Sequence, residues 1–262
     1  MNTGGKTPLL FLHGWAMTPA VWQPLLAALG TDAFDARVPA LPGHVDDGSK
    51  TNMDADATLA DWVETLAPVL PPKTTVIGWS LGAQLALELA RTRPDRVERL
   101  ILFAATPRFV ATTDWPHGLD AATVTAFIEG YAGQPAATRR RFFALQTLGD
   151  AARRQLLPQI EAASIPHAGA GHSLPALAAG LKILADSDLR PGLAAIEQPV
   201  HLIHGDGDAL MPLAAARWLA AALPRARLTV LENCGHAPLL SRPADCAALI
   251  CADFCARQEA CA

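Results

Sequence analysis

Short runs of β-branched and leucine-rich residues recur along the chain, and each run ends near a turn-forming residue, as buried β-strands do. They fall at residues 9–12, 36–41, 74–79, 99–104, 200–204 and 228–231. Stretches with helical spacing lie between most of them, at residues 54–70, 81–91, 213–223 and 244–257. Alternating strands and helices predict an α/β fold with a doubly wound, mainly parallel sheet.

The alternation stops between residues 106 and 199, where the chain has helical patterns and no convincing strand. Helices are expected at about 120–130, 135–148, 150–163 and 174–185. We interpret them as an inserted helical cap, residues 106–190, on a core formed by residues 1–105 and 191–262. The alternative is that these helices simply extend the core.

Composition and charge exclude several classes of protein. Of the 262 residues, 51% are apolar and 18% charged, which favours a folded chain with a substantial core. The net charge of −4 argues against a general nucleic-acid-binding surface. The chain has five cysteines and no CxxC pair, which predicts reduced thiols in the cytoplasm. The apolar run at residues 8–12 is too short for a signal peptide, which also predicts a cytoplasmic protein. The uncharged stretch 162–181 contains Pro, His and Gly residues unsuited to a membrane span, so no membrane partner is expected.

The pentapeptide Gly78-Trp79-Ser80-Leu81-Gly82 has the pattern GxSxG and stands between a predicted strand and a predicted helix. This setting is typical of a nucleophilic serine on a sharp turn, where glycines remove side chains that would clash. Ser80 is therefore the candidate nucleophile. The alternative is a serine that only caps the helix.

A serine hydroxyl needs a base to take its proton, and the base is in turn oriented by an acid. His236 is the candidate base, because it lies in a Gly- and Pro-flanked loop directly after the strand predicted at 228–231. The weaker candidates lie in a predicted strand, in the insertion or before Ser80: His201, His204, His117, His167, His172 and His44. Asp208 is the preferred acid after the strand at 200–204, and Asp206 is the alternative that could brace the turn.

Two backbone amides are expected to stabilise the oxyanion that forms during acyl transfer. One is the amide of Leu81 at the start of the predicted helix. The other is the amide of Trp15 in the loop His13-Gly14-Trp15, after the first predicted strand. The alternative for this loop is an ordinary strand-ending turn.

These motifs, in this order, resemble the α/β-hydrolase superfamily over essentially the whole chain. The closer resemblance is to the carboxylesterases of biotin synthesis, which demethylate pimeloyl-acyl-carrier-protein methyl ester. It rests on His13-Gly14-Trp15, the GxSxG turn, Asp114-Trp115-Pro116, residues 141–149, residues 181–184 and 188–190, and His236-Ala237-Pro238.

The resemblance implies a serine carboxylesterase with the α/β-hydrolase fold, needing no metal or organic cofactor. It implies Ser80, Asp208 and His236 as the catalytic triad and Trp15 and Leu81 as oxyanion and substrate contacts. It also implies a lining over the acyl chain that includes Phe142, Phe143 and Gln146. We expect a monomer that also accepts small esters as surrogate substrates.

The segment 134–158 is basic within an acidic chain and predicts a docking surface for an acidic acyl carrier protein. It holds five arginines against the single acid Asp150: Arg139, Arg140, Arg141, Arg153 and Arg154. Among these, the resemblance implies docking roles for Arg141 and Arg154, and the other three could substitute from adjacent turns. The alternative is a solvated helix face.

Two other classes of function remain open from the sequence. One is a broad-specificity short-chain carboxylesterase, or a C–C bond hydrolase acting on a small substrate with the same triad. The other is a binding protein that keeps the fold without turnover. An intact set of Ser80, Asp208 and His236 argues against the second class, because a binder needs no such set.

A fluorophosphonate probe separates enzyme from binder. We expect stoichiometric labelling of Ser80, because an activated serine attacks the phosphorus, and no labelling of a Ser80→Ala variant. Intact-mass spectrometry and peptide mapping give the readout. An unmodified Ser80 in the folded wild-type protein would favour the binding protein.

Overall fold

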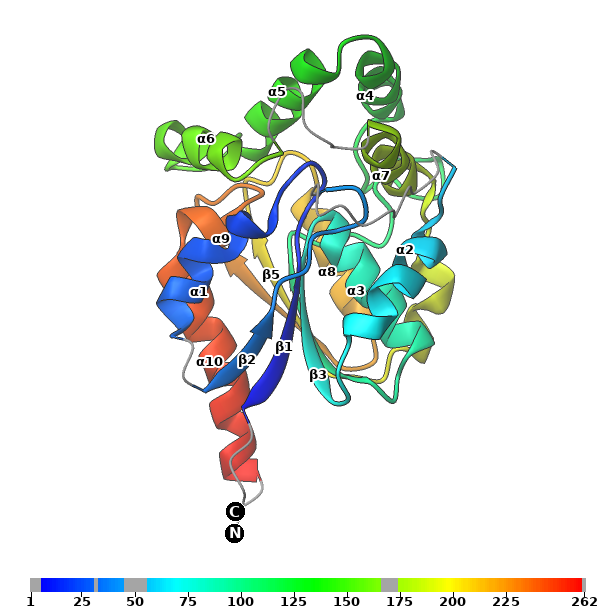
Figure 1. Cartoon of the computed structure of the whole chain (residues 1–262). Coiled ribbons are helices and arrows are strands. Elements are labelled where there is room, and N and C mark those ends of the chain that lie inside the picture. Colours follow the sequence, from blue (N-terminus) through cyan, green and yellow to red (C-terminus); the bar gives the residue numbers. More distant parts are fainter. Residues whose placement is uncertain (1–5, 31–32, 45–55, 166–173, 261–262) are drawn as a thin grey trace.

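The computed structural model describes residues 6–30, 33–44, 56–165 and 174–260, and a six-stranded parallel sheet lies at its centre (Figure 1). The order across the sheet is β2-β1-β3-β4-β5-β6, and every neighbouring pair is parallel. The strands are β1 Thr7–Leu12, β2 Phe34–Arg37, β3 Thr74–Trp79, β4 Val97–Phe103, β5 Val200–Gly205 and β6 Ala226–Leu231. The predicted α/β class and parallel sheet are confirmed.

Helices cover both faces of this sheet (Figure 1). Helices α1 and α10 pack together on one face, and α2, α3 and α8 lie on the other. Their bounds are α1 Gln23–Leu29, α2 Leu59–Leu66, α3 Leu81–Thr92, α8 Leu213–Ala222, α9 Pro238–Ser241 and α10 Pro243–Ala260. Short 3₁₀ helices span Pro19–Trp22, Ala67–Val69 and Arg190–Ala195. Within the described part of the chain, no helix combines the length and the apolar character that crossing a bilayer requires.

Between β4 and β5 the described residues form four α-helices that lie above the carboxyl edge of the sheet (Figure 1). They are α4 Ala121–Gly133, α5 Pro135–Gln146, α6 Arg153–Ala162 and α7 Leu174–Asp186. Each falls where the sequence predicted a helix. We refer to these four helices as the cap, while the exact domain boundaries at residues 106 and 190 stay a prediction.

Two local predictions differ from the structure. The strand predicted at 36–41 lies instead at Phe34–Arg37, where it pairs with β1, because prolines at 39 and 42 cannot donate to a sheet. The helix predicted at 54–70 begins at Leu59, after a capping box formed by Thr58 and Asp61, and residues 54 and 55 lie outside the described residues.

Close packing between β1 and α3 fixes the start of α3 at the sheet edge. A Cβ atom added to Gly82 would collide with the backbone carbonyl group of Leu12, at the end of β1. Because the obstacle is backbone and not a flexible side chain, either the helix or the strand would have to move. The second glycine of the GxSxG motif therefore sets the distance between the two elements.

A Gly82→Ala substitution is expected to lower the free energy of unfolding by about 3 kcal/mol, because the added methyl group overpacks a rigid contact. Urea denaturation followed by circular dichroism measures this change. Gly133→Ala is the matched control: its Cβ would meet no atom within 4 Å, so stability should change by less than about 1 kcal/mol. Equal losses of unfolding free energy in the two variants would show that the contact between Gly82 and Leu12 is not the cause.

Candidate active site

Ser80 occupies the turn between β3 and α3 in a strained backbone conformation. Its φ of 58° and ψ of −117° are unusual for a residue with a side chain and cost about 1–3 kcal/mol. The backbone N–H of Ser80 donates to the carbonyl oxygen of Phe103 on β4, at 3.1 Å, which holds the turn. Leu81 is the first residue of α3, so its N–H has no acceptor within the helix and is available to an oxyanion.

Asp208 follows β5, His236 follows β6, and the two side chains meet. Nδ1–H of His236 donates to Oδ2 of Asp208 at 2.8 Å, and both side chains are buried. Because an ionised carboxylate only accepts hydrogen bonds, the imidazole proton resides on Nδ1. Nε2 then carries the free lone pair. It is buried and has no hydrogen-bond partner among the described residues, so it can accept a proton.

The carboxylate of Asp208 is held on both of its oxygen atoms. Oδ1 accepts from the amides of Leu210 and Met211, each at 2.9 Å, while Nε2 of His204 lies 3.5 Å from Oδ2. Burial raises the pKa of Asp208, but the nearby imidazoles of His236 and His204 and the Met211 amide together lower this pKa below its usual value. Asp208 is therefore ionised at neutral pH and stabilises an imidazolium form of His236.

Contacts between loops bring the turn of Ser80 close to the loop of His236. The indole N–H of Trp79, the residue before Ser80, donates to the carbonyl oxygen of His236 at 2.8 Å. A Cβ atom added to Gly14 would lie 3.4 Å from Cβ of Ser80, so the loop after β1 reaches the same point. Asp206, by contrast, is exposed and accepts from the amide of Cys234 at 3.3 Å. This alternative acid braces the turn, and Asp208 faces the base.

Two buried histidines fix the loop that presents the Trp15 amide. Nε2 of His13 accepts from the Leu41 amide at 3.0 Å, and Nε2 of His44 accepts from the Ala16 amide at 3.1 Å. The second nitrogen of His13 lies 2.9 Å from the carbonyl oxygen of Gly14, to which it donates. His13 is thus neutral and fully paired. The loop is held rigidly on both sides of Trp15, as an oxyanion donor requires.

Aromatic side chains of the cap close over this loop. The ring of Trp15 makes edge contacts with Phe142 of α5 and Tyr131 of α4, with centroids 5.0 and 5.5 Å apart, and its indole N–H donates to Leu177 of α7 at 2.7 Å. Phe143 and Gln146 are also buried, and Oε1 of Gln146 has no hydrogen-bond partner among the described residues. The three predicted lining residues are therefore all buried on α5, and Phe142 directly contacts Trp15.

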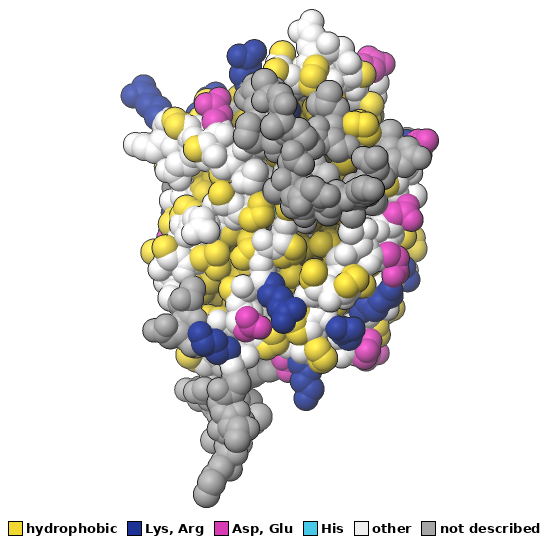
Figure 2. Space-filling model, in the orientation of Figure 1, with side chains coloured by type: hydrophobic (Ala, Val, Ile, Leu, Met, Phe, Trp, Pro, Cys, Tyr) yellow, Lys and Arg dark blue, Asp and Glu magenta, His cyan; other side chains and the backbone are white. Residues whose placement is uncertain are grey.

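The five predicted docking arginines do not share one surface. Four of them are exposed on α5 and at the start of α6: Arg140, Arg141, Arg153 and Arg154. Dark blue side chains project over these helices at the upper left of Figure 2. Arg139 is only 5% exposed, donates to the carbonyl oxygen of Ile165 and lies over the ring of Phe143. The expectation that Arg139 meets a partner was wrong, because the helical repeat turns it inward with Phe142 and Phe143.

Three residues make contacts around the base that the sequence did not predict, although Trp79 was expected to lie beside the acyl chain and His204 was a weaker candidate for the base itself. Trp79 and His204 lie in buried strands, where their contacts with His236 and Asp208 have no local signal. Asp150 accepts from the amide of Gly235 at 3.0 Å, although the sequence showed it only as the single acid in a basic segment. His167 and His172, weaker candidates for the base, lie outside the described residues.

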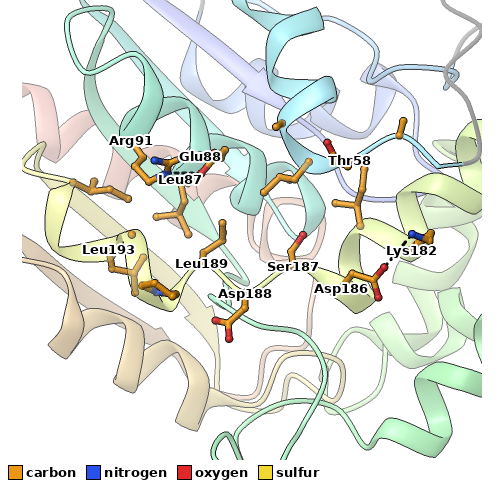
Figure 3. A pocket seen from close by; sticks show the side chains of 17 residues that line it. Thr58, Leu87, Glu88, Arg91, Lys182, Asp186, Ser187, Asp188, Leu189 and Leu193 are labelled. Atoms are coloured by element: carbon orange, nitrogen blue, oxygen red, sulfur yellow. Dashed lines mark hydrogen bonds and ion pairs between the residues drawn. The ribbon is translucent and has the colours of Figure 1, made fainter.

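A pocket of about 620 Å³ lies away from these groups, between α2, α3, α7 and the 3₁₀ helix Arg190–Ala195 (Figure 3). Its charged side chains are paired, Arg91 with Glu88, Lys182 with Asp186, and Asp188 with Arg108 and Arg190 outside the pocket. It contains none of the predicted catalytic residues. Among the described residues, no group of three or more His, Cys, Asp or Glu side chains is placed to hold a metal ion.

The chain belongs to the α/β hydrolase family, whose pattern it matches over residues 9–249. It is 50% identical over 251 residues to the pimeloyl-acyl-carrier-protein methyl ester esterase of Aromatoleum aromaticum, covering 94% of this chain and 97% of that protein. It is 41% identical to the protein of the same name from Nitrosomonas europaea, covering 92% and 93% of the two chains. The resemblance inferred from the motifs is confirmed.

Solved structures show the same fold at low sequence identity. An esterase from Exiguobacterium antarcticum superposes with a TM-score of 0.79 at 20% identity, covering 95% of this chain and 92% of the other. The enol-lactonase of Burkholderia xenovorans LB400 gives a TM-score of 0.80 at 18% identity, covering 98% and 94%.

The neutral state of His13 makes stability depend on pH. Burial lowers the pKa of His13 to about 4, against a smaller opposing effect of its hydrogen bond to Gly14. The unfolded chain, with a pKa near 6.5, binds a proton first as the pH falls. About 3 kcal/mol of unfolding free energy is therefore lost between pH 6.5 and 4.

A His13→Gln variant is expected to have a shallower pH dependence of stability across this range, because it no longer titrates. Urea denaturation of both proteins at half-unit pH steps measures the difference. The comparison with wild type is essential, because burial also lowers the pKa of His204, which adds to the total slope. Parallel curves for the two proteins would show that His13 is not the group responsible.

Proposed function

We propose that this protein is a serine carboxylesterase that hydrolyses pimeloyl-acyl-carrier-protein methyl ester to pimeloyl-acyl-carrier protein and methanol, in biotin synthesis. The observation that carries the proposal is the buried Asp208–His236 pair beside the strained Ser80 turn, in a chain half identical to an esterase of that name. No cofactor takes part in this chemistry.

The proposed reaction has two acyl-transfer steps. Oγ of Ser80 attacks the ester carbonyl carbon while Nε2 of His236 takes its proton, and the amides of Leu81 and Trp15 stabilise the oxyanion. The tetrahedral intermediate collapses to an acyl-enzyme as His236 protonates the departing methanol. Water, deprotonated by His236, then attacks the acyl-enzyme and releases the free carboxylate together with Ser80.

The cap contributes two features that suit this substrate. The buried apolar side chains of Trp15, Phe142 and Phe143 favour an apolar acyl chain, and Gln146 supplies one polar group. Outside, the arginines on α5 and α6 form a basic patch in a chain of net charge −4. Such a patch attracts an acidic carrier protein and fixes its orientation, which raises the rate of encounter.

The basic patch favours a carrier-linked substrate over the two alternatives, a short-chain ester and a substrate of C–C bond hydrolysis. These would use small diffusible substrates and need no docking surface. The names of the relatives favour the carrier-linked ester, and the intact triad residues favour turnover over simple binding. The solved neighbours, at 18–20% identity, support the fold alone.

The test is methanol release from the carrier-linked methyl ester by wild type and by Arg153→Glu/Arg154→Glu. We expect kcat/KM for this substrate to fall at least about tenfold in the variant at low salt, and the loss to shrink at high salt. Hydrolysis of a small nitrophenyl ester should change less than about twofold. Acids in the first turn of α6 suit the helix dipole, so folding should be preserved.

Arg217→Glu/Arg225→Glu is the matched control, because it changes the same charge at exposed positions outside the cap. This control should leave the hydrolysis of both substrates nearly unchanged. Equal losses on both substrates in the α6 variant would exclude the docking surface. Failure of the wild-type protein to release methanol from the carrier-linked ester would exclude the proposed substrate itself.

A further inference from the structure

The turn between α5 and α6, residues 147–152, contacts the loop that carries His236. Oδ2 of Asp150 accepts from the amide of Gly235 at 3.0 Å. The amide of Ala151 donates to the carbonyl oxygen of Asn233 at 2.9 Å. Just before the turn, the carbonyl oxygen of Gln146 accepts from the amide of His236 at 3.2 Å. Three hydrogen bonds therefore join this part of the chain to Asn233, Gly235 and His236, around and at the proposed base.

Hydrogen bonds within its own turn fix Asp150, so its carboxylate can hold the backbone of the His236 loop in place. Oδ1 accepts from the amide of Ala152 at 2.8 Å, and the Asp150 amide donates to Thr147 at 3.2 Å. The residue is only 8% exposed. One carboxylate oxygen thus bonds the cap and the other bonds the catalytic loop.

Tight backbone packing supports the same contact. A Cβ atom on Gly149 would collide with the backbone of Gly207, next to Asp208, and Gly149 itself has a φ of 80°. A Cβ atom on Gly235 would lie 3.1 Å from Cβ of Asp150 and from the carbonyl oxygen of Gln146. The turn therefore packs against the loop of the acid as well as the loop of the base.

We propose that Asp150 is a positioning residue for His236, which it holds from the cap through the backbone amide of Gly235. The proposal rests on the proposed function, in which His236 is the base. Asp208 orients the imidazole ring, and Trp79 bonds the His236 carbonyl oxygen. Asp150 fixes the backbone on the other side. Without its carboxylate, the amide of Gly235 loses its acceptor and the loop gains freedom beside the base.

This arrangement also links the base to the proposed docking helices. Asp150 lies between Arg141 at one side of the turn and Arg153 at the other. A carrier protein bound to these helices would contact the same element that holds His236. The cap thereby contributes to the catalytic geometry as well as to substrate binding.

The competing explanation is that Asp150 serves only to start α6, since Oδ1 satisfies an amide at its N-terminus. Asp120 provides a matched control for that role. It caps α4, another cap helix, by accepting from the amide of Thr123 at 2.9 Å. Among the described residues, Asp120 makes its hydrogen bonds to Thr123 and Val124 and makes none to the loops of Asp208 or His236.

The experiment compares Asp150→Ala, Asp150→Asn and Asp120→Ala in steady-state hydrolysis of a small nitrophenyl ester, with melting temperatures for each. A small ester removes any effect of docking. We expect Asp150→Ala to lower kcat about tenfold with KM changed less than twofold, because a displaced base slows chemistry more than binding. Asp150→Asn keeps one acceptor oxygen and should fall between wild type and Asp150→Ala. Asp120→Ala should keep kcat within twofold of wild type.

A kcat for Asp150→Ala equal to that of wild type, or no lower than that of Asp120→Ala, would overturn the proposal. If Asp150→Ala does not fold, Asp150→Asn decides by the same comparison. His236→Ala is measured beside them to separate the two proposals. Activity retained in His236→Ala would refute the assignment of the base. An inactive His236→Ala with a fully active Asp150→Ala would refute only the positioning role.

Discussion

The buried hydrogen bond between Asp208 and His236 is the constraint on which the site depends. An ionised carboxylate inside a protein is costly unless its oxygens are satisfied. Here two backbone amides and an imidazole donate hydrogen bonds to the oxygens of Asp208. The loops after β5 and β6 must therefore keep one relative position, which a pair of adjacent parallel strands provides. The same bond places the proton on Nδ1 and leaves Nε2 free for proton transfer.

The core and the cap build the site jointly. The strained Ser80 turn and the histidine-braced Trp15 loop belong to the sheet edge, as the fold leads one to expect. The indole of Trp15, however, is bonded to α7, and the backbone of His236 is bonded to the end of α5. Moving the cap would thus disturb groups proposed for the chemistry as well as the proposed acyl-chain lining. The proposed carrier docking and the proposed catalysis would then act on one connected element.

Much of this could be predicted from local sequence patterns. Hydrophobic runs placed all six strands to within a few residues, because a buried parallel strand needs a continuous apolar segment. The GxSxG motif placed Ser80 at a strand-to-helix turn, since only small residues tolerate that geometry. The edge strand β2 was predicted too far along the chain, because Pro39 and Pro42 cannot donate to a sheet and the strand pairs with β1 before them.

The sequence by itself determined the fold class, the nucleophile turn and a short list of acids and bases, because each depends on neighbours within a few residues. Only the tertiary structure decided between Asp206 and Asp208 and brought Asp150 to Gly235. These outcomes depend on contacts between segments far apart in the chain. Such contacts are set by how whole helices and strands pack, and no local periodicity encodes them.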